Sequence, residues 1–250
     1  RLVERRLSGE EVAAFCFGPG TPQETIDAFD AAIFGPIGLR FQQTNRWSVT
    51  ATNPGPLAQG QPTTLTYSFV PDGTSIPDGG FGPGISDLQA FLNARYSNNP
   101  ATWKALYAQV LARWSQLGKV TYVLENNDDG SMLNTLPGSL GVRGDLRFGG
   151  MALDGASNVL AYNYFPNDGD MVLDTSDTFF NNTNNSSRRL RNVLAHEHGH
   201  GLGMLHVCPI NQTKLMEPNV TTSFDGPQFD DILNMQRHYG DTIEPNDTSA

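Results

Sequence analysis

The stretch His196-Glu197-His198-Gly199-His200-Gly201-Leu202-Gly203-Met204-Leu205-His206 holds four of the five histidines of this 250-residue chain. Residues four apart in a helix return to nearly the same face, so His196 and His200 can direct their ring nitrogens to one metal ion. Glu197 lies beside them, where its carboxylate can take a proton from a water molecule as a general base. His198 lies about 200° around the helix from His196, which predicts a structural or surface role.

The third metal ligand has to come from beyond this helix. On a continued helix His206 would be rotated by about 240° from His200 and would face away from the ion. Glycine adopts positive φ without steric cost, so Gly201 and Gly203 can stop the helix, and we expect it to end at Gly203. Three neutral imidazoles leave one zinc position open, which is typical of a catalytic site. The alternative, a histidine-rich helix end without metal, is disfavoured by the fixed offsets of Gly203 and His206.

The extended pattern HExxHxxGxxH resembles the metzincin clan of zinc endopeptidases. Ten residues after His206 comes Leu215-Met216-Glu217-Pro218, which is similar to the Met-turn of that clan, with Met216 as an apolar floor beneath the metal. Simple core packing is the alternative interpretation of this methionine. Within the clan the chain most resembles the matrixins, over roughly residues 60 to 240. The supporting segments are Trp114 with Leu117 to Tyr122, Val159 to Pro166, and Phe229 to Gly240.

This resemblance implies an α+β fold of the metzincin type, with a twisted mixed sheet and long helices. It also implies a secreted, zinc-dependent endopeptidase, of the secreted bacterial type, in which Glu197 is the catalytic base and His196, His200 and His206 bind zinc. An extended substrate would pair with an edge strand near Leu160 and Ala161. Two alternatives remain open, namely a zinc protein that binds peptides without cutting them and a latent precursor.

Further metal sites follow from the same resemblance. Asp154-Gly155, Asp174 and Asp177 match the calcium loop of the matrixins, and calcium prefers carboxylate and carbonyl oxygens. The alternative is that these aspartates only form turns. A second, structural zinc bound by three histidines and an aspartate is not expected. Its positions are occupied by residues that are poor zinc ligands, Leu146 or Arg147, Tyr162 and Val172.

The two cysteines, Cys16 and Cys208, leave three interpretations open. They can form a disulfide, Cys16 can occupy the open zinc position as a cysteine switch, or both can be free thiols. An even number of cysteines in an extracellular protein favours the disulfide. The segment Cys16-Phe17-Gly18-Pro19-Gly20 lacks the sequence that surrounds the matrixin switch cysteine, which disfavours the second interpretation.

The composition limits which classes of binding partner are compatible with the chain. The formal net charge is −10, which argues against nucleic acid or an anionic membrane as a partner. No apolar run reaches the roughly 18 residues that a membrane span requires. The chain starts at Arg1 without a signal peptide, which can have been removed. We therefore expect a secreted monomer that acts on a protein or peptide.

Local patterns predict the organisation of the chain. We expect an N-terminal extension over 1–46, either a pro-segment or a brace, a catalytic domain over 47–240, and a linker over 241–250 that leads to a missing C-terminal domain. Within the first of these, Thr21-Pro22-Gln23-Glu24 is a capping box that predicts a helix to Phe34. The other expected elements are a strand over Thr63 to Val70 and helices that begin near Ser86-Asp87 and after Asn99-Pro100.

Overall fold

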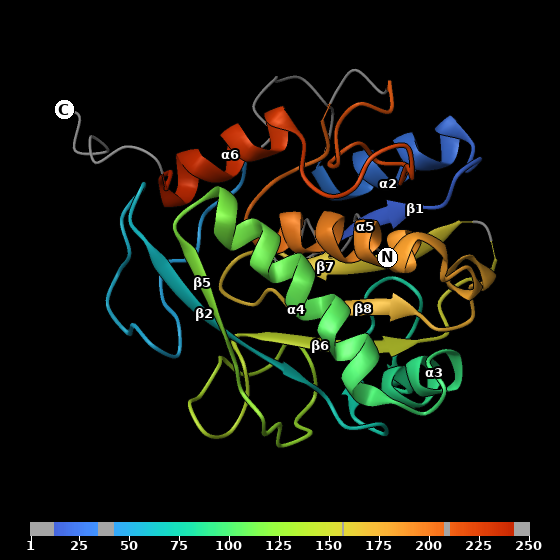
Figure 1. Cartoon of the computed structure of the whole chain (residues 1–250), viewed down its shortest axis with the longest axis horizontal. Coiled ribbons are helices and arrows are strands. Elements are labelled where there is room, and N and C mark those ends of the chain that lie inside the picture. The colour runs from blue at the N-terminus through green and yellow to red at the C-terminus, as the bar shows by residue number, and fades with distance from the viewer. Residues whose placement is uncertain (1–12, 35–42, 157, 208–210, 243–250) are drawn as a thin grey trace.

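A six-stranded mixed sheet crosses the molecule (Figure 1). The computed structural model describes residues 13–34, 43–156, 158–207 and 211–242. The strand order is β1-β7-β8-β6-β2-β5, in which β2 is parallel to β5 and β6, β6 is parallel to β8, and β7 is antiparallel to both of its neighbours. The strands are β1 (Ala13–Phe17), β2 (Thr63–Phe69), β5 (Val120–Leu124), β6 (Leu146–Met151), β7 (Val159–Tyr164) and β8 (Met171–Asp174), and a separate pair is formed by β3 (Ser75–Ile76) and β4 (Gly84–Ile85).

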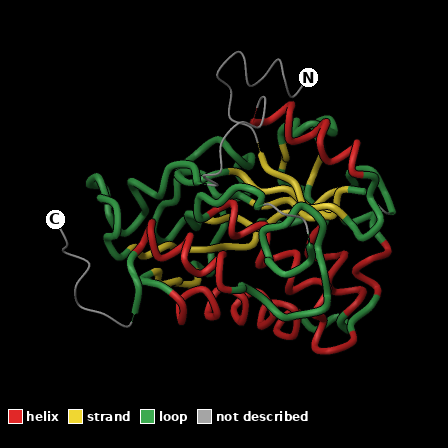
Figure 2. Tube along the Cα trace, turned by 90° about the horizontal axis from the view of Figure 1, so that it is seen from above, coloured by secondary structure: helices red, strands yellow, loops and turns green. Residues whose placement is uncertain are grey.

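The helices cover both faces of this sheet. Figure 1 shows α4 and α5 crossing one face, and Figure 2 shows α2, near the N-terminus, on the opposite side. The expected helices are confirmed at α2, α3 and α4, and the final helix at α6. Their bounds are α2 (Gln23–Phe34), α3 (Leu88–Arg95), α4 (Pro100–Leu117), α5 (Asn184–Gly201) and α6 (Phe229–Tyr239), with a 3₁₀ turn at Thr178–Asn181. The α+β fold is therefore as predicted.

The side chains of β1 alternate between two apolar clusters. Cys16 belongs to the larger cluster, which contains the buried faces of α4 and α5. Phe15 and Phe17 belong to the smaller cluster on the α2 side, where their rings lie 5.1 and 5.5 Å from that of Phe29. Successive side chains of a strand point to opposite faces, so this short strand is fixed from both sides of the sheet.

The helix that carries the histidines ends two residues earlier than predicted. Gly201 is its last residue, Leu202 follows, and Gly203 turns the chain with φ of 95°. A side chain on Gly203 would also clash with the carbonyl oxygen of Asn45. The prediction placed the end at Gly203 because positive φ marks the turn, but the helical hydrogen bonds stop before the residue that needs it. The described helices include none that is long and apolar enough to cross a membrane.

Candidate active site

Three histidine side chains meet at the end of α5. His196 and His200 lie one turn apart, and their Nε2 atoms are 3.1 Å from each other. His206 reaches the same place after the chain has turned at Gly203, and one ring nitrogen from each histidine lies within 4.8 Å of the others. The three rings are buried or nearly so. The structure thus brings together the three residues that the spacing predicted.

The second nitrogen of each ring is held by an acceptor. The Nδ1 atom of His196 lies 2.8 Å from the carbonyl oxygen of Leu215, and that of His200 lies 2.7 Å from the carbonyl oxygen of Met204. A carbonyl oxygen can only accept, so both Nδ1 atoms carry the proton and both Nε2 atoms present a lone pair. Hydrogen bonds of this kind fix the orientation of metal-binding imidazoles.

Burial keeps the imidazoles of His196 and His200 neutral. It lowers the pKa of His196 to about 3, with a further lowering by the charge of His206, and it lowers the pKa of His200 well below its ordinary value. A neutral imidazole is the form that binds zinc. Among the described residues, the buried Nε2 atom of His206 has no hydrogen-bond partner. Three imidazole nitrogens at this spacing, one of them without a partner, fit a zinc ion.

Glu197 is fully buried beside the histidines. Neither of its carboxylate oxygens has a hydrogen-bond partner among the described residues. Burial raises the pKa of this carboxyl group, and the backbone N–H of Cys16, which faces it, acts in the opposite direction. A buried carboxylate with unused oxygens next to a metal site can act as a general base toward a water molecule.

Met216 lies directly beneath this helix. A side chain on Gly199 would clash with the sulfur of Met216, so the glycine permits the close contact. The turn that carries Met216 is fixed by α6, because the Asp231 carboxylate accepts the backbone N–H groups of Leu215 at 2.8 Å and Met216 at 3.1 Å. This contact agrees with the Met-turn resemblance, and the role of Met216 as a floor beneath a metal ion stays a prediction.

Two comparisons with known proteins agree with this geometry. The family model described as Matrixin matches residues 90–240, which is more than half of the chain. This chain belongs to the matrixin family. The hatching enzyme of Paracentrotus lividus is 36% identical over 97 residues, a stretch that covers 36% of this matrixin and 15% of that relative. The three histidines and Glu197 accordingly form the candidate zinc site of this matrixin.

Asp30 is a site residue of this matrixin that sequence reasoning missed. It lies in α2, and its Oδ1 atom is 3.0 Å from Nδ1 of His206. The carboxylate therefore does for His206 what backbone carbonyls do for the other two histidines. The two residues are 176 positions apart, and no motif marks the acidic position in α2, so the sequence held no signal for this contact.

His198 has the structural role that was predicted. It is buried on the other side of α5, where its Nε2 atom lies 2.5 Å from the hydroxyl oxygen of Tyr122 in β5. The ring thus links the zinc helix to the sheet. Burial lowers its pKa to about 3, so the folded protein keeps this imidazole uncharged.

The predicted calcium ligands lie at the end of β8, at Asp174, and in loops, at Asp154 and Asp177. Burial raises the pKa of Asp154, and the charges of Asp174 and Asp177 raise it further, which reflects their proximity. Asp174 uses Oδ1 to accept the backbone N–H of Leu153 at 3.1 Å, while its buried Oδ2 atom has no hydrogen-bond partner. Calcium binding here stays a prediction.

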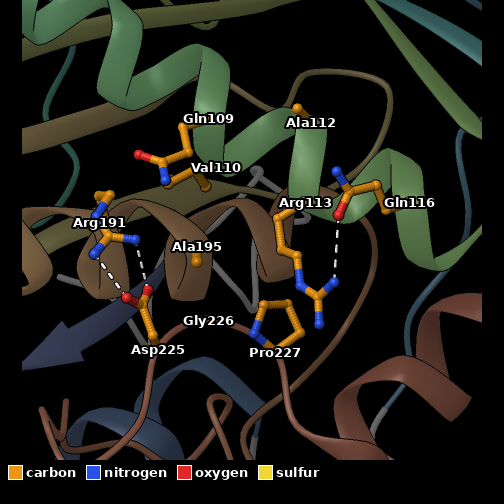
Figure 3. Close-up of a pocket in the computed structure, with 10 residues that line it drawn as sticks. All are labelled: Gln109, Val110, Ala112, Arg113, Gln116, Arg191, Ala195, Asp225, Gly226 and Pro227. Carbon is orange, nitrogen blue, oxygen red and sulfur yellow. Dashed lines mark hydrogen bonds and ion pairs between the residues drawn. The ribbon is translucent and has the colours of Figure 1, made fainter.

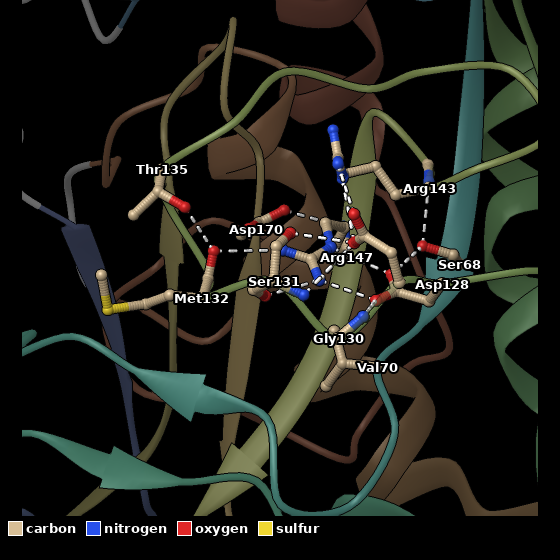
Figure 4. A network of polar contacts seen from close by, with 12 residues as sticks. Ser68, Val70, Asp128, Gly130, Ser131, Met132, Thr135, Arg143, Arg147 and Asp170 are labelled. Carbon is tan, nitrogen blue, oxygen red and sulfur yellow. Dashed lines mark hydrogen bonds and ion pairs between the residues drawn. The ribbon is translucent and has the colours of Figure 1, made fainter.

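A network of polar contacts surrounds Arg147, one of the positions that the resemblance assigned to a structural zinc (Figure 4). The buried guanidinium of Arg147 donates from Nε and Nη2 to the two oxygens of Asp128, at 2.9 and 2.7 Å. It also donates to the carbonyl oxygens of Ser131 and Met132, and Asp170 accepts the backbone N–H of Arg147 at 2.9 Å. This Arg147 network ties the loop after β5 to β6. The other two positions, Tyr162 and Val172, are buried in the sheet.

The predicted edge strand is not at the edge. Leu160 and Ala161 lie in β7 as expected, but β1 pairs with the outer side of that strand. The interpretation of Val159–Tyr164 as an edge is therefore wrong for this structure, because residues 13–17 add one more strand. Whether a substrate pairs with Leu160 and Ala161 stays a prediction.

The sulfur of Cys16 is buried and has no disulfide partner within the described residues. One ligand atom from each of Cys16, His196 and Glu197 forms a group within 4.8 Å. Burial raises the pKa of this thiol well above its ordinary value, and the charge of Glu197 raises it further. Cys208 lies outside the described residues, so the proposed disulfide stays a prediction.

A separate pocket of about 450 Å³ lies between α4, α5 and the loop over 225–227 (Figure 3). Arg191 and Asp225 form an ion pair at its wall, at 2.7 Å. The lining residues include Ala195 but none of the three metal-binding histidines. This pocket is therefore separate from the three-histidine site.

Proposed function

We propose that the protein hydrolyses peptide bonds of protein substrates at this site. The observation that carries the proposal is the group of three imidazoles next to the carboxylate of Glu197, whose oxygens have no hydrogen-bond partner among the described residues. The hatching enzyme is matched over only 15% of its length. The proposed activity is therefore argued from this site and from family membership. The non-cutting zinc protein is disfavoured, because Glu197 is present and its oxygens are free for a water molecule.

The chemistry divides between the metal and Glu197. When bound, zinc supplies a Lewis acid that makes a water molecule more acidic and offsets negative charge on the substrate carbonyl oxygen. Glu197 accepts a proton from the attacking water. The protonated carboxyl group then gives that proton to the leaving amine as the carbon–nitrogen bond breaks. Asp30 and the carbonyl groups of Leu215 and Met204 hold the imidazoles in the required tautomer.

Three finer features belong to the same proposal. An extended substrate pairs with β7 near Leu160 and Ala161 by backbone hydrogen bonds. Calcium binds at Asp154, Asp174 and Asp177, where carboxylates converge and one buried oxygen has no partner. The protein acts as a secreted monomer, which agrees with its acidic composition.

Digestion of an unfolded protein tests the proposed function. The zinc-loaded chain, before and after limited trypsin treatment, is compared with the Glu197→Gln variant and with chelated protein. We expect cleavage by the wild type, a loss of rate of about 10²- to 10⁴-fold in the variant, and equal zinc content in both. A wild type that binds zinc but cuts nothing, even after trypsin, would establish the non-cutting alternative.

A further inference from the structure

The pocket between α4, α5 and the loop over 225–227 has the lining of a ligand site (Figure 3). Its volume is about 450 Å³. The buried residues that line it include Val110, Ala195 and Pro227, which are apolar. The exposed lining residues include the amides Gln109 and Gln116. Ligand sites of proteins commonly combine this size with an apolar lining and a few polar groups.

One end of the pocket is electrically balanced. Arg191 pairs with Asp225 through two hydrogen bonds of 2.7 Å. Its Nε and Nη2 atoms also donate to the carbonyl oxygens of Ser186 and Asn185. The Asp225 carboxylate lies 3.8 Å from Nε of Arg188 as well. Because two arginines share this carboxylate, it has no unbalanced negative charge to offer a cationic ligand.

The other end carries a guanidinium without a counter-ion. Arg113 extends from α4 toward Pro227 (Figure 3). A guanidinium has five N–H donors. Within the described residues Arg113 uses one of them, which donates to Oε1 of Gln116 at 3.3 Å, and it pairs with no carboxylate. Its other donors can therefore bind a ligand that presents acceptor oxygens.

The charges around the pocket favour an anion. The charged residues that line it are Arg113, Arg191 and Asp225, which gives a local excess of positive charge on a chain of net charge −10. A planar guanidinium matches a carboxylate with two parallel hydrogen bonds. A phosphate monoester carries about −1.5 to −2 charges, which is more than one guanidinium balances. The apolar part of the lining suits a hydrocarbon chain rather than a second charge.

We propose that this pocket binds a carboxylate group that is carried on an apolar chain. Arg113 binds the carboxylate, and Val110, Ala195 and Pro227 contact the apolar chain. The inference does not depend on the proposed peptidase activity, because the lining includes none of the three metal-binding histidines. A free small acid and an acidic side chain flanked by apolar residues in a peptide both present this chemistry.

NMR titration of the zinc-loaded Glu197→Gln chain with hexanoate tests the inference. We expect saturable shifts of the side-chain amide signals of Gln109 and Gln116 and of the Ala195 methyl group. Hexanamide has the same shape without the charge, so it should bind about tenfold more weakly. Hexanoate on the zinc ion would instead shift the ring signals of the three histidines. Unshifted pocket signals, or equal binding of hexanamide, would overturn the inference.

Two pairs of variants test the charge and the space separately. Arg113→Gln should weaken hexanoate binding by about 10- to 100-fold, whereas Arg237→Gln, at an exposed position outside the pocket, should not change it. Ala112→Trp should block the pocket, while Ala105→Trp, at an exposed position of the same helix, should leave binding intact. Unchanged affinity in Arg113→Gln or in Ala112→Trp would contradict the assignment of the site.

A peptide ligand distinguishes the two sources of the carboxylate. Acetyl-Leu-Glu-Leu-amide is compared with acetyl-Leu-Gln-Leu-amide in the same titration, where the Glu197→Gln substitution keeps the peptides intact. Tighter binding of the glutamate peptide than of hexanoate would assign the pocket to acidic segments of proteins. The reverse order would assign it to small acids. If neither ligand shifts the pocket signals, the inference is wrong, whatever the chain does to an unfolded protein.

Discussion

The three-histidine site and the Arg147 network treat buried polar groups in opposite ways. At the site, the oxygens of Glu197 and the Nε2 atom of His206 have no hydrogen-bond partner in the part of the chain that the structure describes. In the network, all three nitrogens of the Arg147 guanidinium donate to oxygens of Asp128 or of the neighbouring backbone. Unpaired buried polar groups are costly. The three-histidine site therefore has room for a ligand to satisfy its polar groups, whereas the Arg147 network is complete without one.

Zinc should therefore stabilise the protein strongly when it binds at the three-histidine site. At free zinc a thousandfold above its dissociation constant, binding to the folded state adds about 4 kcal/mol to the free energy of unfolding. Urea unfolding with and without a chelator measures this difference. The His200→Ala variant should lose most of it, and an equal zinc effect in that variant would contradict the assignment of the ligands.

Removal of the Arg147 guanidinium should lower the stability of the protein without changing its affinity for zinc. Arg147→Met leaves the buried carboxylate of Asp128 without its counter-ion, which costs about 3 kcal/mol of stability or more. Arg143→Met is the matched control, because its partner Asp129 is one-third exposed and such pairs contribute about 0–1 kcal/mol. Equal losses in the two variants, or weaker zinc binding in Arg147→Met, would break the comparison.

Asp30 gives a smaller and more specific effect. Asp30→Ala removes the acceptor that orients His206, so zinc affinity should fall by about 10- to 100-fold. Asp27→Ala in the same helix is the control, since Asp27 is exposed and bonds only to Gln23 among the contacts described for it. Competition with a chelating dye measures both affinities. Unchanged affinity in Asp30→Ala would show that the α2 contact is incidental.

The buried histidines should also make the metal-free protein sensitive to acid. The pKa of His198 is lowered to about 3 in the folded state, so its contribution is complete above the unfolded value near 6.5 and is lost as the pH falls. The loss is about 1.4 kcal/mol per pH unit between those values. His198→Phe should flatten the stability curve by that slope. Parallel curves for the two proteins would mean that the ring is protonated in the folded state.

The catalytic helix could be predicted because its information is local. His196 and His200 share a face by helical geometry alone, and the glycines that follow mark the turn to His206. Helices α2 and α3 are predicted from the capping residues at their starts, and α4 from the helical spacing of its apolar residues. The resemblance to matrixins then supplied the floor beneath the metal, which local patterns could not have distinguished from core packing.

The features that escaped prediction depend on contacts between distant segments. The pairing of β1 with β7 joins residues that are nearly 150 positions apart, and the sequence Ala13-Ala14-Phe15-Cys16-Phe17 is too short to predict a partner strand. The contact between Asp30 and His206 is equally remote. Arg147 was recognised only as a poor zinc ligand, because its role depends on Asp128 across a loop.

The end of the zinc helix has a consequence for the order of assembly during synthesis. The indole N–H of Trp47 donates to the carbonyl oxygen of Gly201 at 2.7 Å, and the hydroxyl of Tyr239 donates to that of Leu202 at 3.0 Å. Tyr239 is made about 40 residues after His200, a delay of roughly 2 to 8 seconds at ordinary translation rates. Until then the end of α5 has the hydrogen bond from Trp47 but not the one from Tyr239. We expect a nascent chain to capture its metal only after α6 has emerged and docked.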